Sequence, residues 1–320
     1  MQVPVLDPAK SFGVDISSAQ LVIASAELGK PVISIANTPS AVTRWLKTLG
    51  PGCRIGMEAT GSYHRCLADL AVAAGHTVWV FNPTSVAHYL RSQRARGKTD
   101  PLDARGIARY VLHEAETLHP YVPPSPLQDR LHRLIQRRHQ IVKQRASLQM
   151  SLADLPECDA EIGQLRAALN AVLARIDALI ELAGASDPAW LARRNQLRSI
   201  NGFGPLVSAA VAARLSRAPY ANSDAVVAAF GMDPRPRDSG QYSGTRQLSK
   251  RGNAEERRLI YCAAMAACRY PLFKSMRDKL VDRGFSPIQA YCAIAPKLLR
   301  IAFAVWRSNQ PFNPQRVGLA

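Results

Sequence analysis

The chain has 320 residues, 47% of them hydrophobic, which is enough to bury the cores of two domains. Its net charge is +17, of which residues 201–320 carry +11, and such an excess is typical of proteins that bind a polyanion, because neutralising phosphates releases counterions. The sequence has no run of 18 apolar residues, no secretion-signal pattern and no Cys-x-x-Cys pair, so we expect a cytoplasmic protein without a membrane span, zinc site or disulfide framework.

Short apolar strands come first between residues 11 and 122, and strands then alternate with helices. The expected strands are 12–17, 21–27, 31–37, 54–60 and 77–83, and the expected helices are 41–50, 62–75, 84–94 and one that starts at Asp100. This order predicts a mixed α/β sheet with helices on its faces.

A proline-rich break at 119–127 ends that region, and a heptad-like pattern follows. Leucine and isoleucine recur at spacings of four and three from Leu127 to Leu155 and again from Ile162 to Leu179. The pattern predicts two coiled-coil helices joined by a turn, with an apolar seam that packs against the other helix or a second protomer. Arg138 and Arg145 interrupt the seam, and they either face nucleic acid or pack their stems.

The last region is mostly helical and rich in alanine and arginine. Residues 197–215 read as a helix, a Gly-x-Gly turn and a second helix, which is similar to a helix-hairpin-helix motif. In such a motif the turn amides at Gly202 and Gly204 and the next helix N-terminus can bind a phosphate. The expected domains are therefore 1–122, 123–185 and 186–320.

Four acidic residues lie where the expected elements of the first domain begin or end. Asp15 and Glu58 end strands, and Asp100 and Asp103 occupy the first turn of a helix, on one face. Carboxylate oxygens suit Mg²⁺, and two ions about 4 Å apart can activate a nucleophile and stabilise a leaving oxygen at phosphorus. Alternatively, Asp100 and Asp103 are ordinary helix-start residues and Glu58 is a surface residue.

Several longer segments resemble one known family. FGVDISSAQ, MEATGSYHRCLADLAVAAGHTVWVFNP and KTDPLDARGIA look like the ribonuclease-H-like, RuvC-type domain of the DEDD transposases of the one-ten insertion-sequence family, which includes the pilin-gene invertases. SINGFGPLVSAA, AAFGMDPRPRDSG and LSKRGNAEERRLIYCAAMAA are similar to its C-terminal domain. The resemblance spans most of the chain, and it implies that the family's acidic tetrad falls on Asp15, Glu58, Asp100 and Asp103.

The resemblance also implies that the family's nucleophilic serine falls on Ser239, in PRPRDSG. A serine on a glycine-containing loop beside Arg235 and Arg237 can attack a phosphodiester and hold DNA as a phosphoserine. Without the resemblance, Asp-Ser-Gly would be an ordinary turn, and Ser243 and Ser249 are competing candidates.

Basic residues flank both groups of candidate catalytic residues, and we expect them to contact phosphates. They are Lys98, Arg105 and Arg109 beside the second acid pair, and Lys250, Arg251 and Arg257 after the serine. The alternative for each is a solvated basic helix face.

The resemblance implies a transposase or site-specific recombinase that uses two Mg²⁺ ions, replaceable by Mn²⁺, on donor and target DNA. It further implies a homo-oligomer, guidance by a non-coding RNA, and work at the prokaryotic nucleoid. Two alternatives remain open. One is a RuvC-like nuclease in which water attacks, and the other is a non-catalytic nucleic-acid-binding scaffold.

Overall fold

A computed structural model describes residues 7–59, 61–92, 99–235, 238–239, 242–243 and 247–316. By its internal contacts the chain divides into two units, Met1–Pro123 and Pro124–Ala320. The expected division of the second unit at residue 185 remains a prediction.

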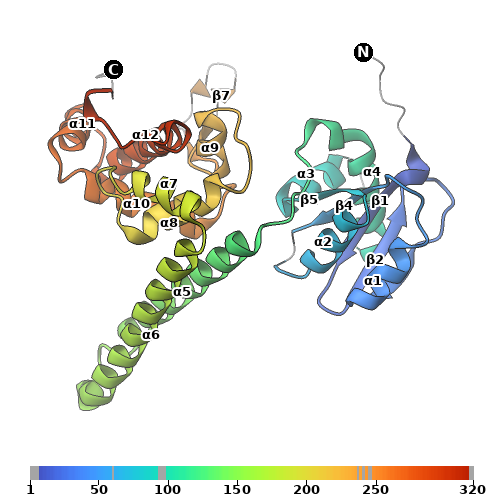
Figure 1. The fold of residues 1–320 in the computed structure, drawn as a ribbon, viewed down its shortest axis with the longest axis horizontal. Helices are drawn as coiled ribbons and strands as arrows, with labels where there is room; N and C mark the ends of the chain where they lie inside the picture. Colours follow the sequence, from blue (N-terminus) through green and yellow to red (C-terminus); the bar gives the residue numbers. More distant parts are fainter. Residues whose placement is uncertain are drawn as a thin grey trace. The chain divides into compact units, whose positions relative to one another are not determined.

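A five-stranded sheet forms the centre of the first unit (Figure 1). Its strands are β1 (Ser11–Ile16), β2 (Gln20–Ser25), β3 (Ile33–Ala36), β4 (Arg54–Glu58) and β5 (Thr77–Phe81). They lie in the order β3-β2-β1-β4-β5, with β2 antiparallel to β1 and β3, and with β4 parallel to β1 and β5. The carboxyl ends of β1, β3, β4 and β5 therefore meet at one edge. The prediction of a mixed α/β sheet is confirmed.

Helices cover both faces of this sheet. They are α1 (Pro39–Leu46), α2 (Arg65–Ala73), α3 (Pro83–Ser92) and α4 (Asp100–Glu114). Val14 and Ile16 of β1 pack in one apolar cluster with residues of α1 and α2. Trp79 and Phe81 of β5 pack in a separate cluster with residues of α3 and α4. Because strand side chains alternate, the odd-numbered residues of β1 belong to the α4 face.

The second unit begins with a helical hairpin made of α5 (Pro126–Ser151) and α6 (Asp159–Ala185). Ser125 starts α5 with a capping box, and the 3₁₀ turn η3 (Pro156–Cys158) reverses the chain. Near the bundle, residues such as Leu131 and Ile180 are buried. Every residue from 136 to 172 is described, and none of them is buried. The outer hairpin therefore leaves its apolar seam partly open.

Both seam arginines bind the facing helix. Arg138 donates from Nε to Oδ1 of Asp177 at 2.6 Å and from Nη2 to Oδ2 at 3.1 Å. Arg145 donates from Nη1 to Oδ1 of Asn170 at 2.5 Å. These contacts join α5 to α6 at fixed positions. Of the two roles expected for the seam arginines, contact with nucleic acid or packing within the hairpin, the structure shows packing.

Among the residues that the structure describes, six further helices form a bundle around one apolar core (Figure 1). They are α7 (Pro188–Leu197), α8 (Pro205–Leu215), α9 (Ser223–Ala229), α10 (Ala254–Ala267), α11 (Pro271–Asp282) and α12 (Pro287–Ser308). In the part of the chain that the structure describes, α12 alone has the length and hydropathy of a membrane span. Half of its apolar window is buried, with Leu298 and Leu299 fully enclosed, as in the core helix of a folded domain.

Candidate active site

Asp15 and Glu58 occupy matching positions on adjacent parallel strands. β1 pairs with β4 so that Gly13 faces Gly56 and Val14 faces Met57. Continuing this register by one residue sets Asp15 beside Glu58, which pairs on its other side with Phe81 of β5. Asp15 and Glu58 each lie two residues beyond a glycine, so both point to the α4 face, and both are partly exposed.

Two glycines let α4 lie directly on these strands. A Cβ on Gly13 would come under 3.0 Å from the main chain of Ala104 and Ala108, and a Cβ on Gly56 would come equally close to Val111. A side chain at either position would push the helix away from the sheet. The glycines therefore determine how closely α4, with its two acids, approaches the strands that carry Asp15 and Glu58.

The direction of α4 brings its first turn to the edge where the strands end. Tyr110, within α4, packs its ring on Phe81 at 4.7 Å, whereas Leu118, after the helix, accepts a hydrogen bond from the Trp79 indole at 3.3 Å. The chain thus runs back along β5, antiparallel to it. Asp103, one residue before Ala104, lies at the Asp15 end of β1. Asp100 is exposed one turn earlier, on the same side of the helix.

Carboxylate oxygens are the donors that Mg²⁺ prefers, so the chemistry of this group fits the ion. Within the described residues, no three or more histidine, cysteine, aspartate or glutamate side chains are already arranged to hold a metal. The main chain sets the four acids at one edge of the sheet.

Ser239 lies in one of two short antiparallel strand pairs, which are together called the ribbon. One pair joins β6 (Pro234–Arg235) to β9 (Gln247–Leu248), and the other joins β7 (Asp238–Ser239) to β8 (Tyr242–Ser243). Ser239 is paired with Tyr242, and Asp238 is paired with Ser243.

The base of the ribbon is tightly held. Gly231 takes a φ of +66°, and a Cβ there would come under 3.0 Å from the main chain of Gly252. Lys250 takes a φ of +53° and donates its amide to the Gly231 carbonyl at 3.1 Å. Ser249 donates its hydroxyl to Oδ1 of Asp233. The Ser249 hydroxyl therefore holds the base of the ribbon, and the sequence pattern had not singled out its partner Asp233.

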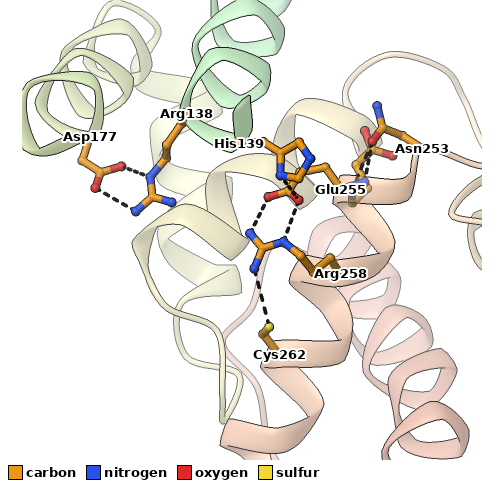
Figure 2. A network of polar contacts seen from close by, with 8 residues as sticks. Arg138, His139, Asp177, Asn253, Glu255, Arg258 and Cys262 are labelled. Atoms are coloured by element: carbon orange, nitrogen blue, oxygen red, sulfur yellow. Dashed lines mark hydrogen bonds and ion pairs between the residues drawn. The ribbon is translucent and has the colours of Figure 1, made fainter. Parts of the chain in front are cut away.

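A buried carboxylate joins the hairpin to the helix that follows the ribbon (Figure 2). Glu255, in the first turn of α10, accepts two hydrogen bonds from Arg258, at 2.6 and 2.7 Å. Nδ1 of His139, on α5, lies 2.6 Å from the Oε2 atom of Glu255. The start of α10, just after Lys250 and Arg251, is thereby fixed to the foot of the hairpin. The sequence pattern had singled out neither His139 nor Glu255.

The next residue of α10 is partly buried. Glu256 lies 3.8 Å from Nε of Arg214, and burial raises the pKa of its carboxyl although Arg214, Arg217 and Arg257 lower it. Arg214 also donates to the Ala229 carbonyl at 2.8 Å. Arg257 donates to the Gly252 carbonyl. Both arginines thus stabilise main-chain segments at the base of the ribbon, and Arg257, expected to contact nucleic acid, makes a structural contact.

The remaining basic candidates differ in their surroundings. Arg105 and Arg109 are exposed on α4, and Arg235, Lys250 and Arg251 are exposed on or beside the ribbon. Lys98 and Arg237 lie outside the described residues. All five described side chains are accessible to a phosphate.

The two glycines of the predicted hairpin motif have different roles. Gly202 has a φ of +86°, and a Cβ there would come under 3.0 Å from the main chain of α10, so it serves helix packing. Gly204 is exposed, caps α8, and has open space around its Cα. Of the two, Gly204 is the one placed at an accessible helix N-terminus.

Two family models match the chain. One, a DEDD transposase model named for IS110 and described as a transposase, covers residues 12–155. The other, described as a transposase of the IS116/IS110/IS902 family, covers residues 194–279. The matched segments include the four acids in the first unit and Ser239 in the second.

Related proteins agree with these matches. The pilin gene-inverting proteins of Moraxella bovis and Moraxella lacunata are each 29% identical to the chain over 266 residues, which is 80% of this chain and 81% of theirs. A 42 kDa protein of the insertion element IS900 from Mycobacterium paratuberculosis is 29% identical over 119 residues, 36% of this chain and 30% of its own. The chain therefore carries the transposase domains of the IS110 family and is homologous to the pilin gene-inverting proteins, which indicates a DNA-processing enzyme.

Proposed function

We propose that this transposase breaks and rejoins DNA by phosphoryl transfer, with the acids of a ribonuclease-H-like, RuvC-type first unit and with Ser239 as nucleophile. The observation that carries the proposal is the alignment of Asp15 and Glu58 on adjacent parallel strands under the helix that begins with Asp100 and Asp103. Acids that end neighbouring strands lie where open α/β sheets bind their ligands.

The four carboxylates would hold two Mg²⁺ ions, or Mn²⁺ in their place. Bound there, the ions would offset the negative charge that develops on the phosphate oxygens. The residues themselves would orient the scissile phosphate against the sheet edge. Arg105 and Arg109, which are exposed, would contact neighbouring phosphates of the DNA backbone.

Ser239 would supply the attacking oxygen. Its hydroxyl proton leaves, a bond forms between Oγ and phosphorus, and the bond from phosphorus to one sugar oxygen breaks, with that oxygen taking up a proton. In the second step a sugar hydroxyl of the recombining strand attacks the phosphoserine and restores the serine hydroxyl. Each step replaces one phosphodiester bond by another, so no nucleotide cofactor is needed.

We further propose that the active complex is a homo-oligomer in which the acids of one subunit meet Ser239 of another. The support is the outer hairpin, where the seam residues Leu148, Leu165 and Val172 are 37%, 42% and 46% exposed. A second copy of the hairpin would cover such a seam. The +17 charge is compatible with a guide RNA that pairs with donor and target DNA. A protein that acts on genomic DNA would work at the prokaryotic nucleoid.

A plasmid that carries the coding region with its natural flanking DNA tests the acids. Excision or inversion, scored by amplification across the new junctions, should fall at least a thousandfold in Asp15→Asn and Glu58→Gln. Glu27→Gln is the control, because Glu27 is a partly exposed acid in a loop of the same unit. Full recombination by Asp15→Asn would overturn the catalytic role and leave a nucleic-acid-binding scaffold.

The serine is tested by trapping the protein on DNA. Denaturing gels should show a wild-type protein–DNA adduct that is absent from Ser239→Ala and present in Ser243→Ala. Cleavage by Ser239→Ala with Mg²⁺ would identify a nuclease in which water attacks. Sequencing the RNA that copurifies with the protein, and finding no complementarity to the ends of the element, would contradict RNA guidance.

A further inference from the structure

Asn37 forms a bridge between two loops of the first unit. It follows β3, and its side-chain Nδ2 donates to the carbonyl of Ser17 at 2.9 Å and to the carbonyl of Tyr63 at 3.1 Å. Its own amide donates to the carbonyl of Ala19 at 2.9 Å. One residue thus binds the turn between β1 and β2 and the loop that follows β4.

Those two loops directly continue the strands that carry the candidate acids. Ser17 comes two residues after Asp15, and Tyr63 comes five residues after Glu58. Strand pairing by itself fixes β1 against β4 only up to Val14 and Met57. Beyond that point, the Asn37 side chain provides a connection between the two chain segments.

Within the described residues, two side-chain hydrogen bonds orient the Asn37 amide. Its Oδ1 atom is buried and has no hydrogen-bond partner among the described residues. Leaving a buried carbonyl oxygen unpaired is unfavourable, so the amide is held in place by its two donor contacts. An aspartate would have nearly the same shape but would present oxygen to both carbonyls, so the bridge requires an amide.

We propose that Asn37 is a positioning residue for the acidic site: it fixes the loops after β1 and β4 and thereby sets the separation of Asp15 and Glu58. The proposal rests on the proposed function of those two acids. In this proposal Asn37 contacts neither DNA nor metal, and it acts through the main-chain carbonyls of Ser17 and Tyr63.

The variants are Asn37→Ala, which removes both donors, and Asn37→Asp, which keeps the size and removes the donors. Asn82→Ala is the matched control. Asn82 follows β5 at the same edge of the sheet, but its Oδ1 accepts only a local hydrogen bond, from the amide of Thr84 at 2.9 Å. Any general effect of removing an asparagine from a strand end should appear in both alanine variants.

Amide hydrogen exchange of the full-length protein measures the bridge. In Asn37→Ala and Asn37→Asp the amides of residues 17–20 and 61–64 should exchange at least tenfold faster than in the wild type, whereas Asn82→Ala should leave both segments unchanged. Wild-type exchange in both Asn37 variants would overturn the inference. This readout involves neither metal nor activity, and faster exchange confined to these two segments distinguishes loss of the bridge from a general loss of stability.

The shift in melting temperature on adding MgCl₂ measures the consequence for the acids, because a ligand of the native state stabilises it. In both Asn37 variants the shift in melting temperature should be at most half of the wild-type shift, and in Asn82→Ala it should equal the wild-type shift. An undiminished shift in the Asn37 variants would overturn the inference. A wild-type shift that persists in Asp15→Asn would instead contradict the proposed metal site, which separates the two failures.

Discussion

Gly13 of β1 lies against the main chain of Ala104 in α4, and no space remains between them for a side chain. Ala104 follows Asp103, and Gly13 precedes Asp15 by two residues. The closest approach of helix and sheet therefore lies next to two of the candidate catalytic acids. A change in this packing distance changes the acidic site as well as the core.

Gly13→Ala should accordingly destabilise the first unit by about 3 kcal/mol, because the added methyl group would have to displace helix main chain. Urea unfolding followed by circular dichroism measures the loss. Gly50→Ala is the control, since a Cβ there meets nothing within 4 Å. Equal stability of the two variants would show that α4 does not lie against Gly13 as described.

The bidentate contact between Arg138 and Asp177 should contribute about 1 kcal/mol, because Arg138 is only 20% exposed and both nitrogen–oxygen contacts are close. A double-mutant cycle of Arg138→Ala and Asp177→Ala, measured by thermal unfolding, gives this coupling. The same cycle on Arg133 and Asp129, a pair 3.4 Å apart within one helix in which Arg133 is 67% exposed, should give about 0.3 kcal/mol. A coupling of zero between Arg138 and Asp177 would mean that the arginine does not align the hairpin.

Ser249→Ala should separate a structural serine from a nucleophilic one. It removes the hydroxyl bonded to Asp233 at the base of the ribbon, which should cost about 1 kcal/mol of stability. Because the ribbon keeps its other contacts, recombination should fall only a few-fold, and the covalent DNA adduct should persist. Loss of the adduct in Ser249→Ala, with its presence in Ser239→Ala, would transfer the nucleophilic role to Ser249.

Glu256→Gln should become more stable relative to the wild type as pH rises. Burial raises the pKa of the Glu256 carboxyl in the folded state above its unfolded value of about 4.3. The contribution of Glu256 to the free energy of unfolding is therefore fully present below that pH and is lost as pH rises through the folded pKa. Glutamine stays neutral and avoids this loss. Urea unfolding at pH 4 and pH 8 checks the sign, with the exposed Glu161→Gln as control. A stability difference that shrinks at pH 8 would show that Arg214 outweighs burial.

Much of the first unit could be predicted from its sequence, because its strands and helices have different periods. The apolar run at 77–81 ends at Asn82-Pro83, and β5 ends at Phe81. The strand-end positions of Asp15 and Glu58 follow from the same pattern. Their alignment could not be predicted, because register depends on how β1 and β4 pair, and the pairing of Gly13 with Gly56 is a tertiary feature.

Local pattern was less informative where one residue serves a distant segment. Gly202 and Gly204 look alike in a Gly-x-Gly turn, yet only Gly202 packs on α10, some 60 residues later. Asn37 resembles any polar residue after a strand, and its bridge to Ser17 and Tyr63 requires three segments folded together. Such residues could not be distinguished from ordinary turn residues before the contacts were known.

The antiparallel run of α4 along β5 has an electrostatic consequence. The amino-terminal end of a helix carries about half a positive elementary charge from its aligned peptide dipoles. In this protein that end lies at the edge of the sheet where Asp15 and Glu58 project, and it begins with Asp100 and Asp103 themselves. The fold therefore supplies a permanent, partial counter-charge that eases the mutual repulsion of four carboxylates before any cation arrives.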